Sequence, residues 1–188
     1  LWKLLGGARQ KVPIYATCGF DFLDNDGLAE SMQRMLAKGY RSVKMQVGRP
    51  GLDDRKGHNP LQDQVKRDIA RVRRVRETVG HDVELSIDAV CRLDLTKALD
   101  LAHACEELDV SFFEEPIMQN DVRLLAHMRS QTRLKLSAGQ NEGLAYRFRD
   151  MLLADAVDVV QPNVIITGGP TQCLKISGMA AAFNVPIS

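Results

Sequence analysis

Short apolar runs alternate along this chain with longer segments whose apolar residues recur every three or four positions. The short runs predict strands, at residues 12–16, 41–47, 83–88, 110–115, 134–139, 157–162 and 185–188. The longer segments predict helices, at residues 26–38, from about 65 to a stop at Gly80, 96–108, 121–129, 144–153, and from Pro170 to about 183. This regular alternation of β and α predicts a parallel α/β sheet or barrel.

The pattern amounts to an incomplete barrel. A closed barrel of this kind usually needs eight strands and about 250 residues, whereas this chain has 188 residues and ends inside the seventh predicted strand. An open sheet edge and an open core would face water. We therefore expect a fragment of a longer protein, or a barrel that a partner completes, and we do not expect it to fold alone.

Composition narrows the classes of partner. The chain is long enough to bury a core of its own, and its formal net charge is +1. Without an acidic or basic field, binding to nucleic acid or to a membrane surface is not expected. The basic run at residues 66–76 fits the solvated face of an amphipathic helix. No apolar run reaches 18 residues, so no membrane span is predicted.

The four cysteines are scattered along the chain, and none forms a CxxC pair. A structural zinc site is therefore not expected. Free, scattered cysteines are typical of a reducing, cytoplasmic setting.

Three polar residues stand at the ends of successive predicted strands. They are Asp88 in SIDAV, Glu114 in FFEEP and Gln140 in SAGQNEG, and each stands 26 positions after the one before it. Equivalent ends of parallel strands converge at the mouth of a barrel, where such enzymes place their sites. Converging oxygen donors favour a hard divalent cation such as Mg²⁺. The alternative is that Asp88 and Glu114 are merely solvated or salt-bridged.

Six motifs occur in a characteristic order: SVKMQVG, SIDAV, FFEEP, LSAGQNEG, QPNVIITGG and AAFNVPIS. With this order and spacing the chain resembles the barrel domain of the enolase superfamily, and most of all its mandelate racemase and acid-sugar dehydratase branch. The resemblance implies a partial modified (β/α)7β barrel, which lacks the α+β capping domain and the last strands. Residues 1–11 would then be the exit from a missing capping domain, and residues 12–188 a barrel domain truncated in strand seven.

The resemblance also implies a chemistry. In that family Mg²⁺ binds the substrate carboxylate, a base removes the proton α to it, and the metal stabilises the resulting enediolate. The metal ligands fall on Asp88, Glu114 and Gln140. Lys44 matches the lysine near the substrate carboxylate, although it could equally be a barrel-end lysine in an ion pair. Asn163 falls where the family has the aspartate that supports a catalytic histidine.

Three of these positions depart from the family by losing charge. Gln140 replaces a glutamate and would bind the metal more weakly, unless Glu142 turns inward and substitutes for it. Gln46 stands where many relatives have a catalytic lysine, and an amide cannot act as a base near neutral pH. Asn163 can orient an imidazole but adds no charge. Gln46 and Gln161 are candidates to contact the substrate, and Asn163 could also contact it directly.

Neighbouring residues have more ordinary interpretations. Glu115 should point away from Glu114 along a strand and so act as a support or loop residue. Tyr15 is expected in the core or at the rim, although it could face a ligand. His58, in the long polar loop at residues 48–60, is expected to be an exposed loop residue rather than part of a lid. Gly168 and Gly169 fit a tight strand-to-helix turn.

Two functions remain in view. The first is a Mg²⁺-dependent lyase or isomerase acting on a sugar acid or related hydroxy acid, in which Lys44 and Asn163 serve catalysis and a residue past Ser188 is the base. Dehydration is favoured over racemisation, because racemisation needs competent groups on both faces of the substrate. The second is a catalytically degenerate relative that binds a ligand or has a structural role. In either case we expect the whole protein to form homo-oligomers.

Overall fold

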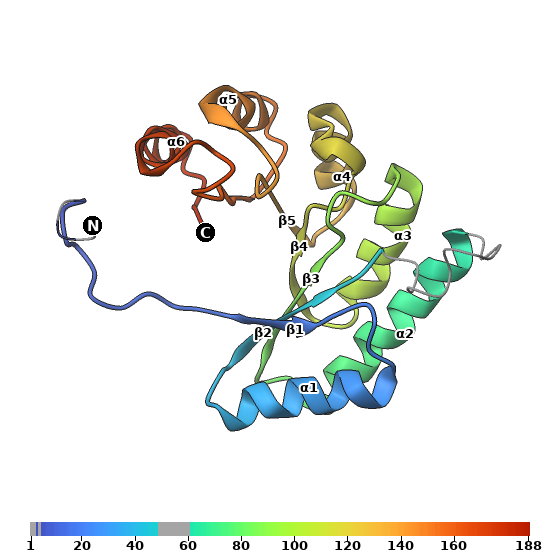
Figure 1. The fold of residues 1–188 in the computed structure, drawn as a ribbon. Coiled ribbons are helices and arrows are strands. Elements are labelled where there is room, and N and C mark those ends of the chain that lie inside the picture. Colours follow the sequence, from blue (N-terminus) through green and yellow to red (C-terminus); the bar gives the residue numbers. More distant parts are fainter. Residues whose placement is uncertain (1–2, 4, 49–60) are drawn as a thin grey trace.

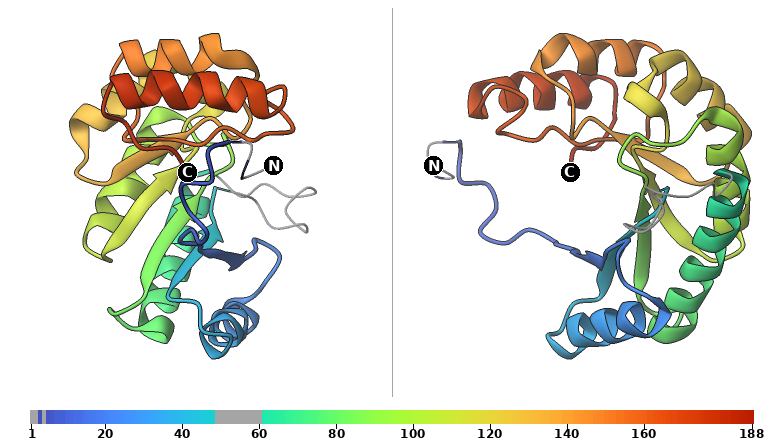
Figure 2. Two further views of the ribbon diagram at one scale, coloured as in Figure 1. Left: turned by 90° about the vertical axis from the view of Figure 1, so that its left-hand side faces the viewer. Right: turned by 45° about the vertical axis from the view of Figure 1, so that its right-hand side comes forward.

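The computed structural model describes residues 3, 5–48 and 61–188. It contains one sheet of six parallel strands in the order β1-β2-β3-β4-β5-β6. Their bounds are β1 Ala16–Gly19, β2 Ser42–Gln46, β3 Glu84–Asp88, β4 Val110–Glu114, β5 Lys135–Ala138 and β6 Val159–Val160. The sheet is curved, with the helices on its outer side and the inner side open (Figures 1 and 2). This is the α/β class and parallel order that the sequence predicted.

Six α-helices connect and follow the strands. Their bounds are α1 Asn25–Ala37, α2 Leu61–Val79, α3 Leu95–Glu106, α4 Val122–Gln131, α5 Leu144–Leu153 and α6 Pro170–Ala182. Aspartates begin three of them, since a carboxylate at the N-cap accepts from the first free backbone N–H groups. The caps are Asp24, Asp94 and Asp121. Of the two candidate caps for α3, Asp94 rather than Thr96 takes the role.

Strand alternation divides the sheet into an apolar and a polar face. Fully buried apolar side chains fill the layer between sheet and helices: Val43, Met45, Leu85, Ile87, Phe113 and Leu136. The residues between them carry polar side chains to the inner face, because successive side chains in a strand point to opposite sides. The register places Gln46 beside Asp88, and Asp88 beside Glu114. The polar strand ends therefore lie next to one another at one edge of the sheet.

The first predicted strand was misplaced. It was expected at residues 12–16, but pairing begins at Ala16 and runs to Gly19. Pro13 has no N–H to donate, and Val12 and Ile14 are 66% and 64% exposed. The segment before β1 instead leads away from the sheet on its open inner side (Figure 2).

Residues 185–188 were predicted to start a seventh strand, and they begin to pair in parallel with β6. Residues 185–188 form only an isolated parallel bridge, between Val160 and Ile187. β6 is itself only two residues long, so this edge of the sheet is weakly paired. One element was missed, the short 3₁₀ helix η2 at Met118–Asn120, where Gln119 and Asn120 have positive φ. Most of the predicted loop at residues 48–60, including His58, lies outside the described residues.

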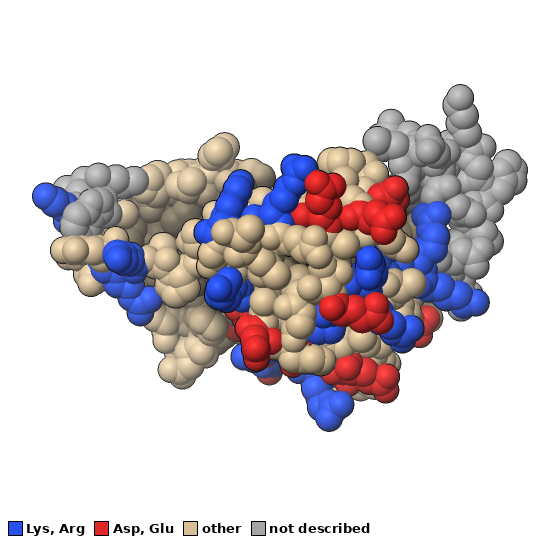
Figure 3. Space-filling view, turned by 90° about the horizontal axis from the view of Figure 1, so that it is seen from below, with Lys and Arg blue, Asp and Glu red and all other residues tan. Residues whose placement is uncertain are grey.

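The surface matches the balanced composition. On the face drawn in Figure 3, acidic and basic side chains are interspersed over much of the surface. Among the helices that the structure describes, none has both the length and the apolar character that crossing a bilayer would require.

Candidate functional site

Two carboxylates and one ammonium group meet at the carboxyl ends of β2, β3 and β4. Lys44, Asp88 and Glu114 are 4%, 6% and 1% exposed. The Lys44 Nζ donates a hydrogen bond to Glu114 Oε2 and lies 3.7 Å from Asp88 Oδ2. The register sets Gln46, Asp88 and Glu114 side by side. Lys44 stands two residues before Gln46 on the same face of β2, and its long side chain reaches both carboxylates. Of the interpretations left open by the sequence, the buried ion pair of Lys44 is present.

The two carboxylates of this cluster keep Lys44 in its charged form. Burial raises the pKa of Asp88 to about 6, and the neighbouring charge of Glu114 adds to the increase while Lys44 opposes it. Burial alone would lower the pKa of Lys44, but the charges of Glu114 and Asp88 outweigh burial and raise it. Lys44 is therefore held as a cation by two carboxylates that repel each other.

Two further side chains complete the buried cluster. Gln161, just after β6, donates from Nε2 to Glu114 Oε2 at 3.2 Å. The Tyr15 hydroxyl lies 3.4 Å from both Lys44 Nζ and Gln161 Nε2, and Lys44 Nζ is 4.9 Å from the centre of the Tyr15 ring. Tyr15 therefore belongs to the site, which the sequence did not establish because residues 12–16 were read as a strand of the core.

Two acceptors in the site have no partner among the residues that the structure describes. They are the buried Oε1 atoms of Gln46 and Gln161. Gln46 ends β2 beside Asp88, and Gln161 already donates to Glu114. A buried polar atom without a hydrogen bond is unfavourable by about 1–3 kcal/mol. These two oxygens are suited to accept hydrogen bonds from a ligand.

The remaining predicted site residues lie at the same edge of the sheet but outside the buried cluster. Gln140 follows β5 and is exposed. Asn163 accepts a hydrogen bond from Ile165 N at 3.0 Å and thereby closes the turn after β6. Glu142 is bound to Arg147 Nε at 2.7 Å and to Asn120 Nδ2 at 3.1 Å. Its carboxylate is thus engaged away from Asp88 and Glu114.

Glu115 supports the loops around the site, in line with the role that the sequence suggested. It is 1% exposed and accepts hydrogen bonds from the loops after β3, β4 and β5. Strand alternation suggested that it simply points away from Glu114, but its φ of 43° lies in the left-handed region. The adjacent pair of glutamates before Pro116 was the available signal.

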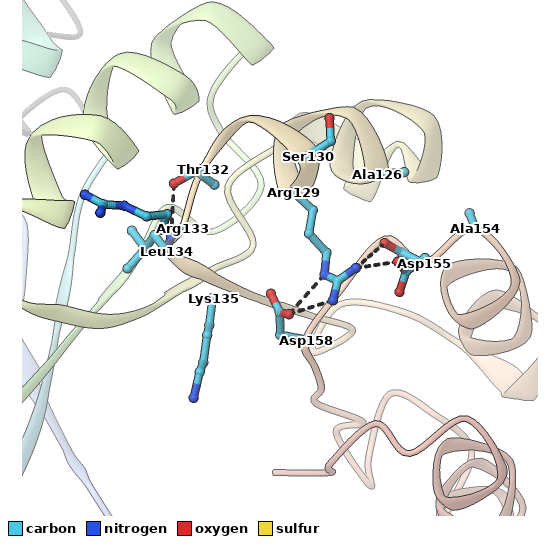
Figure 4. Close-up of a pocket in the computed structure, with 10 residues that line it drawn as sticks. All are labelled: Ala126, Arg129, Ser130, Thr132, Arg133, Leu134, Lys135, Ala154, Asp155 and Asp158. Atoms are coloured by element: carbon cyan, nitrogen blue, oxygen red, sulfur yellow. Dashed lines mark hydrogen bonds and ion pairs between the residues drawn. The ribbon is translucent and has the colours of Figure 1, made fainter.

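Two hollows lie against the sheet. A cavity of about 960 Å³ opens on the inner side of the sheet, and Tyr15, Phe112, Ser137 and Gln161 are among its lining residues. This larger hollow reaches the amino ends of β2 and β3, since Ser42 and Glu84 are among its lining residues. A smaller hollow of about 430 Å³ lies at the amino end of β5, where Arg129 is bound by Asp155 and Asp158 (Figure 4). Only the first adjoins the buried charge cluster.

The donor set is one of oxygens. Within the described residues, no three side chains of the His, Cys, Asp or Glu type converge in a way that could hold a metal. Any metal centre at Asp88 and Glu114 would thus need a third donor of another type, and Gln140 is the amide at the next strand end.

Comparison with known proteins assigns this chain to a family. A family model described as "Enolase C-terminal domain-like" matches residues 27–188. Arabinonate dehydratase of Saccharolobus solfataricus is 28% identical over 189 residues, covering 100% of this chain and 47% of that protein. The 3,6-anhydro-alpha-L-galactonate cycloisomerase of Streptomyces coelicolor is 32% identical, covering 98% and 48%. The chain thus spans about half the length of these curated relatives.

Solved structures of similar proteins match the fold of this chain. A racemase from Streptomyces coelicolor A3(2) with bound magnesium has a TM-score of 0.88 and 30% identity over 99% of this chain and 48% of that one. L-Talarate dehydratase from Polaromonas, complexed with Mg and L-glucarate, has a TM-score of 0.86 and 27% identity over 98% and 48%. The family model covers most of the chain, and the chain therefore belongs to the enolase superfamily through its C-terminal, barrel-like domain.

Proposed function

We propose that the whole protein is a Mg²⁺-dependent enzyme that removes the proton α to the carboxylate of a sugar acid, and that dehydration is the outcome. The observation that carries this proposal is the buried cluster of Lys44, Asp88 and Glu114 at the carboxyl ends of parallel strands. Similarity to sugar-acid dehydratases and to a racemase supports the reaction class.

The residues present fit a magnesium ion. Asp88 and Glu114 supply two carboxylates in one buried place, and hard oxygen donors are those Mg²⁺ prefers. We assign the third position to Gln140, whose amide oxygen brings no charge. When bound there, magnesium would act as a Lewis acid toward the substrate carboxylate.

Lys44 is assigned to the substrate carboxylate. Its ammonium group stays charged because Glu114 and Asp88 flank it, and a cation held in a buried site attracts an anion strongly. It would neutralise part of the charge that develops on the substrate when the proton leaves.

The amides are assigned to binding rather than proton transfer. The unpaired Oε1 atoms of Gln46 and Gln161 can accept hydrogen bonds from substrate hydroxyls, which suits a polyhydroxy acid. Asn163 is assigned to orienting a catalytic partner. Because Gln46 cannot take a proton at neutral pH, we assign the general base to a residue outside positions 1–188. Lack of a base on the Gln46 side disfavours racemisation.

The domain division remains part of the proposal. Residues 1–11 would lead from a capping domain, and 12–188 would form most of the barrel. The segment before β1 runs away from the sheet without pairing, which suits a connection of this kind (Figure 1). We also propose that the whole protein forms homo-oligomers, which sedimentation would test.

The test begins with a calorimetric titration of the whole protein with magnesium, with Asp88→Ala as the control. Binding that disappears in the control supports the metal centre. A screen of sugar acids with magnesium would follow, with Glu114→Gln as its control. No binding at millimolar magnesium, or no turnover above the Glu114→Gln variant, contradicts the proposal.

A second candidate is a catalytically degenerate relative that binds a ligand or has a structural role. The neutral residues Gln46, Gln140 and Asn163 favour it. The discriminating measurement is exchange of the substrate α-proton in deuterated water. Exchange requires proton abstraction and would rule this candidate out.

A further inference from the structure

A hydrogen-bond network surrounds the site and centres on Glu115. Its Oε1 accepts from Asn141 N at 3.0 Å and from Asn120 Nδ2 at 3.2 Å. Its Oε2 accepts from Asn141 Nδ2, and from Cys91 Sγ at 3.2 Å. One carboxylate thus ties together the loops that follow β3, β4 and β5. The first two loops follow the strands that end in Asp88 and Glu114, and the third carries Gln140.

The backbone of Glu115 is fixed as well. Its N–H donates to Ser137 O at 2.8 Å, and its carbonyl accepts from Cys91 N at 2.8 Å. Its φ of 43° is unusual for a residue with a side chain. Such a conformation persists only where surrounding bonds determine it. The turn after Glu114 is therefore held by backbone and side chain together.

The turn that carries Gln140 is held in place by contacts of the residues before and after it. Before it, Gly139 has a φ of 122°, and a Cβ at that position would lie 2.4 Å from the ring of Phe148. After it, Asn141 donates to Glu115 from both backbone and side chain. Gln140 is exposed between these two anchors, so its backbone position depends on them.

The network continues from Glu115 through Asn120 to Glu142, whose charge is neutralised by Arg147. Asn120 Nδ2 lies between the carboxylates of Glu115 and Glu142, and Arg147 neutralises Glu142 at 2.7 Å. Arg147 makes no such bond to Glu115, whose donors are the neutral groups of Asn120, Asn141 and Cys91.

We propose that Glu115 is a positioning residue for the third metal donor, because it holds the β5–α5 turn in the place from which Gln140 reaches the ion. This inference rests on the proposed metal centre. It explains how a neutral amide suffices as the third donor: a ligand oriented in advance loses less conformational entropy on binding. Glu115 itself does not coordinate the metal.

The experiment compares the magnesium affinity of the whole protein with that of Glu115→Ala, by calorimetry under conditions where both are folded. Loss of a group that orients a metal ligand typically weakens affinity 10–100-fold, and we expect a loss of roughly that size. Glu115→Gln should lose less, because its remaining carbonyl oxygen can still accept from Asn141 N.

A matched control is Glu106→Ala. Glu106 also accepts from a loop backbone N–H, that of Arg133 at 2.7 Å, and from the side chain of Thr132, but at the opposite end of β5. Its removal should leave magnesium affinity unchanged within about twofold.

A double-mutant cycle shows whether Glu115 acts through Asn141. Asn141→Ala should weaken magnesium binding, and the double variant should lose little more than the larger single loss, since both remove one interaction. In the metal-free protein, hydrogen exchange at residues 139–143 should speed up in Glu115→Ala and stay unchanged in Glu106→Ala.

The outcomes separate this inference from the proposed function. If the unaltered protein binds no magnesium, the metal centre is wrong and this inference falls with it. If that protein binds magnesium and Glu115→Ala binds it equally well, the metal centre stands and the positioning role of Glu115 is wrong. Unchanged hydrogen exchange at residues 139–143, or fully additive losses in the cycle, would also overturn it.

Discussion

Buried charged side chains lie at both ends of the parallel sheet, but they have different partners at each end. At the amino end, Arg76 of α2 is 4% exposed and donates to four backbone carbonyls, those of Gly80, Val83, Leu108 and Asp109, at 2.6–2.9 Å. Each of these acceptors lies just before β3 or β4 begins. The guanidinium group thus joins the chain segments that lead into β3 and β4.

At the carboxyl end, Glu115 also joins chain segments, but the adjacent Glu114 belongs to a second cluster that combines charges with amides. Lys44 is shared by Asp88 and Glu114, and the Oε1 atoms of Gln46 and Gln161 lack partners among the described residues. In barrels of this kind the amino end serves stability and the carboxyl end carries the site. The difference shows which residues to alter for stability and which for function.

Arg76→Met is expected to have the largest effect. It keeps the apolar stem but removes all four bonds to buried carbonyls, and should lower the free energy of unfolding by roughly 3–5 kcal/mol. Chemical denaturation would measure this loss. Magnesium affinity of the folded variant should not change. Arg76→Lys should lose less, and an equal loss in both would mean that packing rather than the guanidinium fork matters.

Lys44→Met should have the next largest effect, and on function. Turnover of a sugar acid should fall roughly 100-fold, because the cation that faces the substrate carboxylate is gone. Magnesium affinity should rise, since no ammonium group then competes for Asp88 and Glu114. Lys135→Met, at an exposed lysine of β5, is the control. Turnover that survives Lys44→Met would remove Lys44 from the mechanism.

Gln140→Glu should strengthen magnesium binding by about tenfold, which corresponds to about 1.4 kcal/mol. The added carboxylate would restore a third formal charge at the site. Gln119→Glu adds the same charge on the exposed η2 at the same end of the sheet, and serves as the control in calorimetry. Equal gains in both variants would show a general charge effect and would remove Gln140 as a ligand.

The smallest effect is expected from Asp158→Asn at the amino end. Asp158 accepts from Arg129 Nε at 3.0 Å and from Leu136 N at 2.8 Å, as part of the pair drawn in Figure 4. Its neutralisation should lower the free energy of unfolding by about 1 kcal/mol. Asp155→Asn, at a side chain that is 79% exposed, should lose clearly less. A reversed order would contradict the importance given to burial.

Much of the fold could be predicted because local patterns determine it. The spacing of apolar residues located α1, α3 and α5 within about two residues. The equal spacing of Asp88, Glu114 and Gln140 predicted that these residues lie at the same end of the sheet. The errors have local causes too. Pro13 has no N–H to donate, and β1 begins after it, at Ala16. The 3₁₀ helix at Met118–Asn120 was missed because it is only three residues long. The periodicity of apolar residues alone does not reveal either of these features.

The candidate site could be predicted only in part. Asp88 and Glu114 lie side by side as the register of parallel strands requires, and the side chains of Lys44 and Gln161 reach them. The roles of Gln140 and Asn163 remain predictions, since the structure shows them at the same end of the sheet without a ligand contact. The supporting role of Glu115 agrees with the sequence, but its left-handed φ and its partners in three loops could not be read from strand alternation.

By itself, the sequence determined the alternation of strands and helices, the apolar layer between them and the polar residues at the strand ends. These follow from side-chain periodicity and from residue chemistry, which act over short distances along the chain. Only the tertiary structure decided that Lys44 pairs with both carboxylates, that Tyr15 joins them, and that Glu115 binds three loops. Those contacts link residues up to 146 positions apart, as between Tyr15 and Gln161, and only packing brings such groups within hydrogen-bond distance.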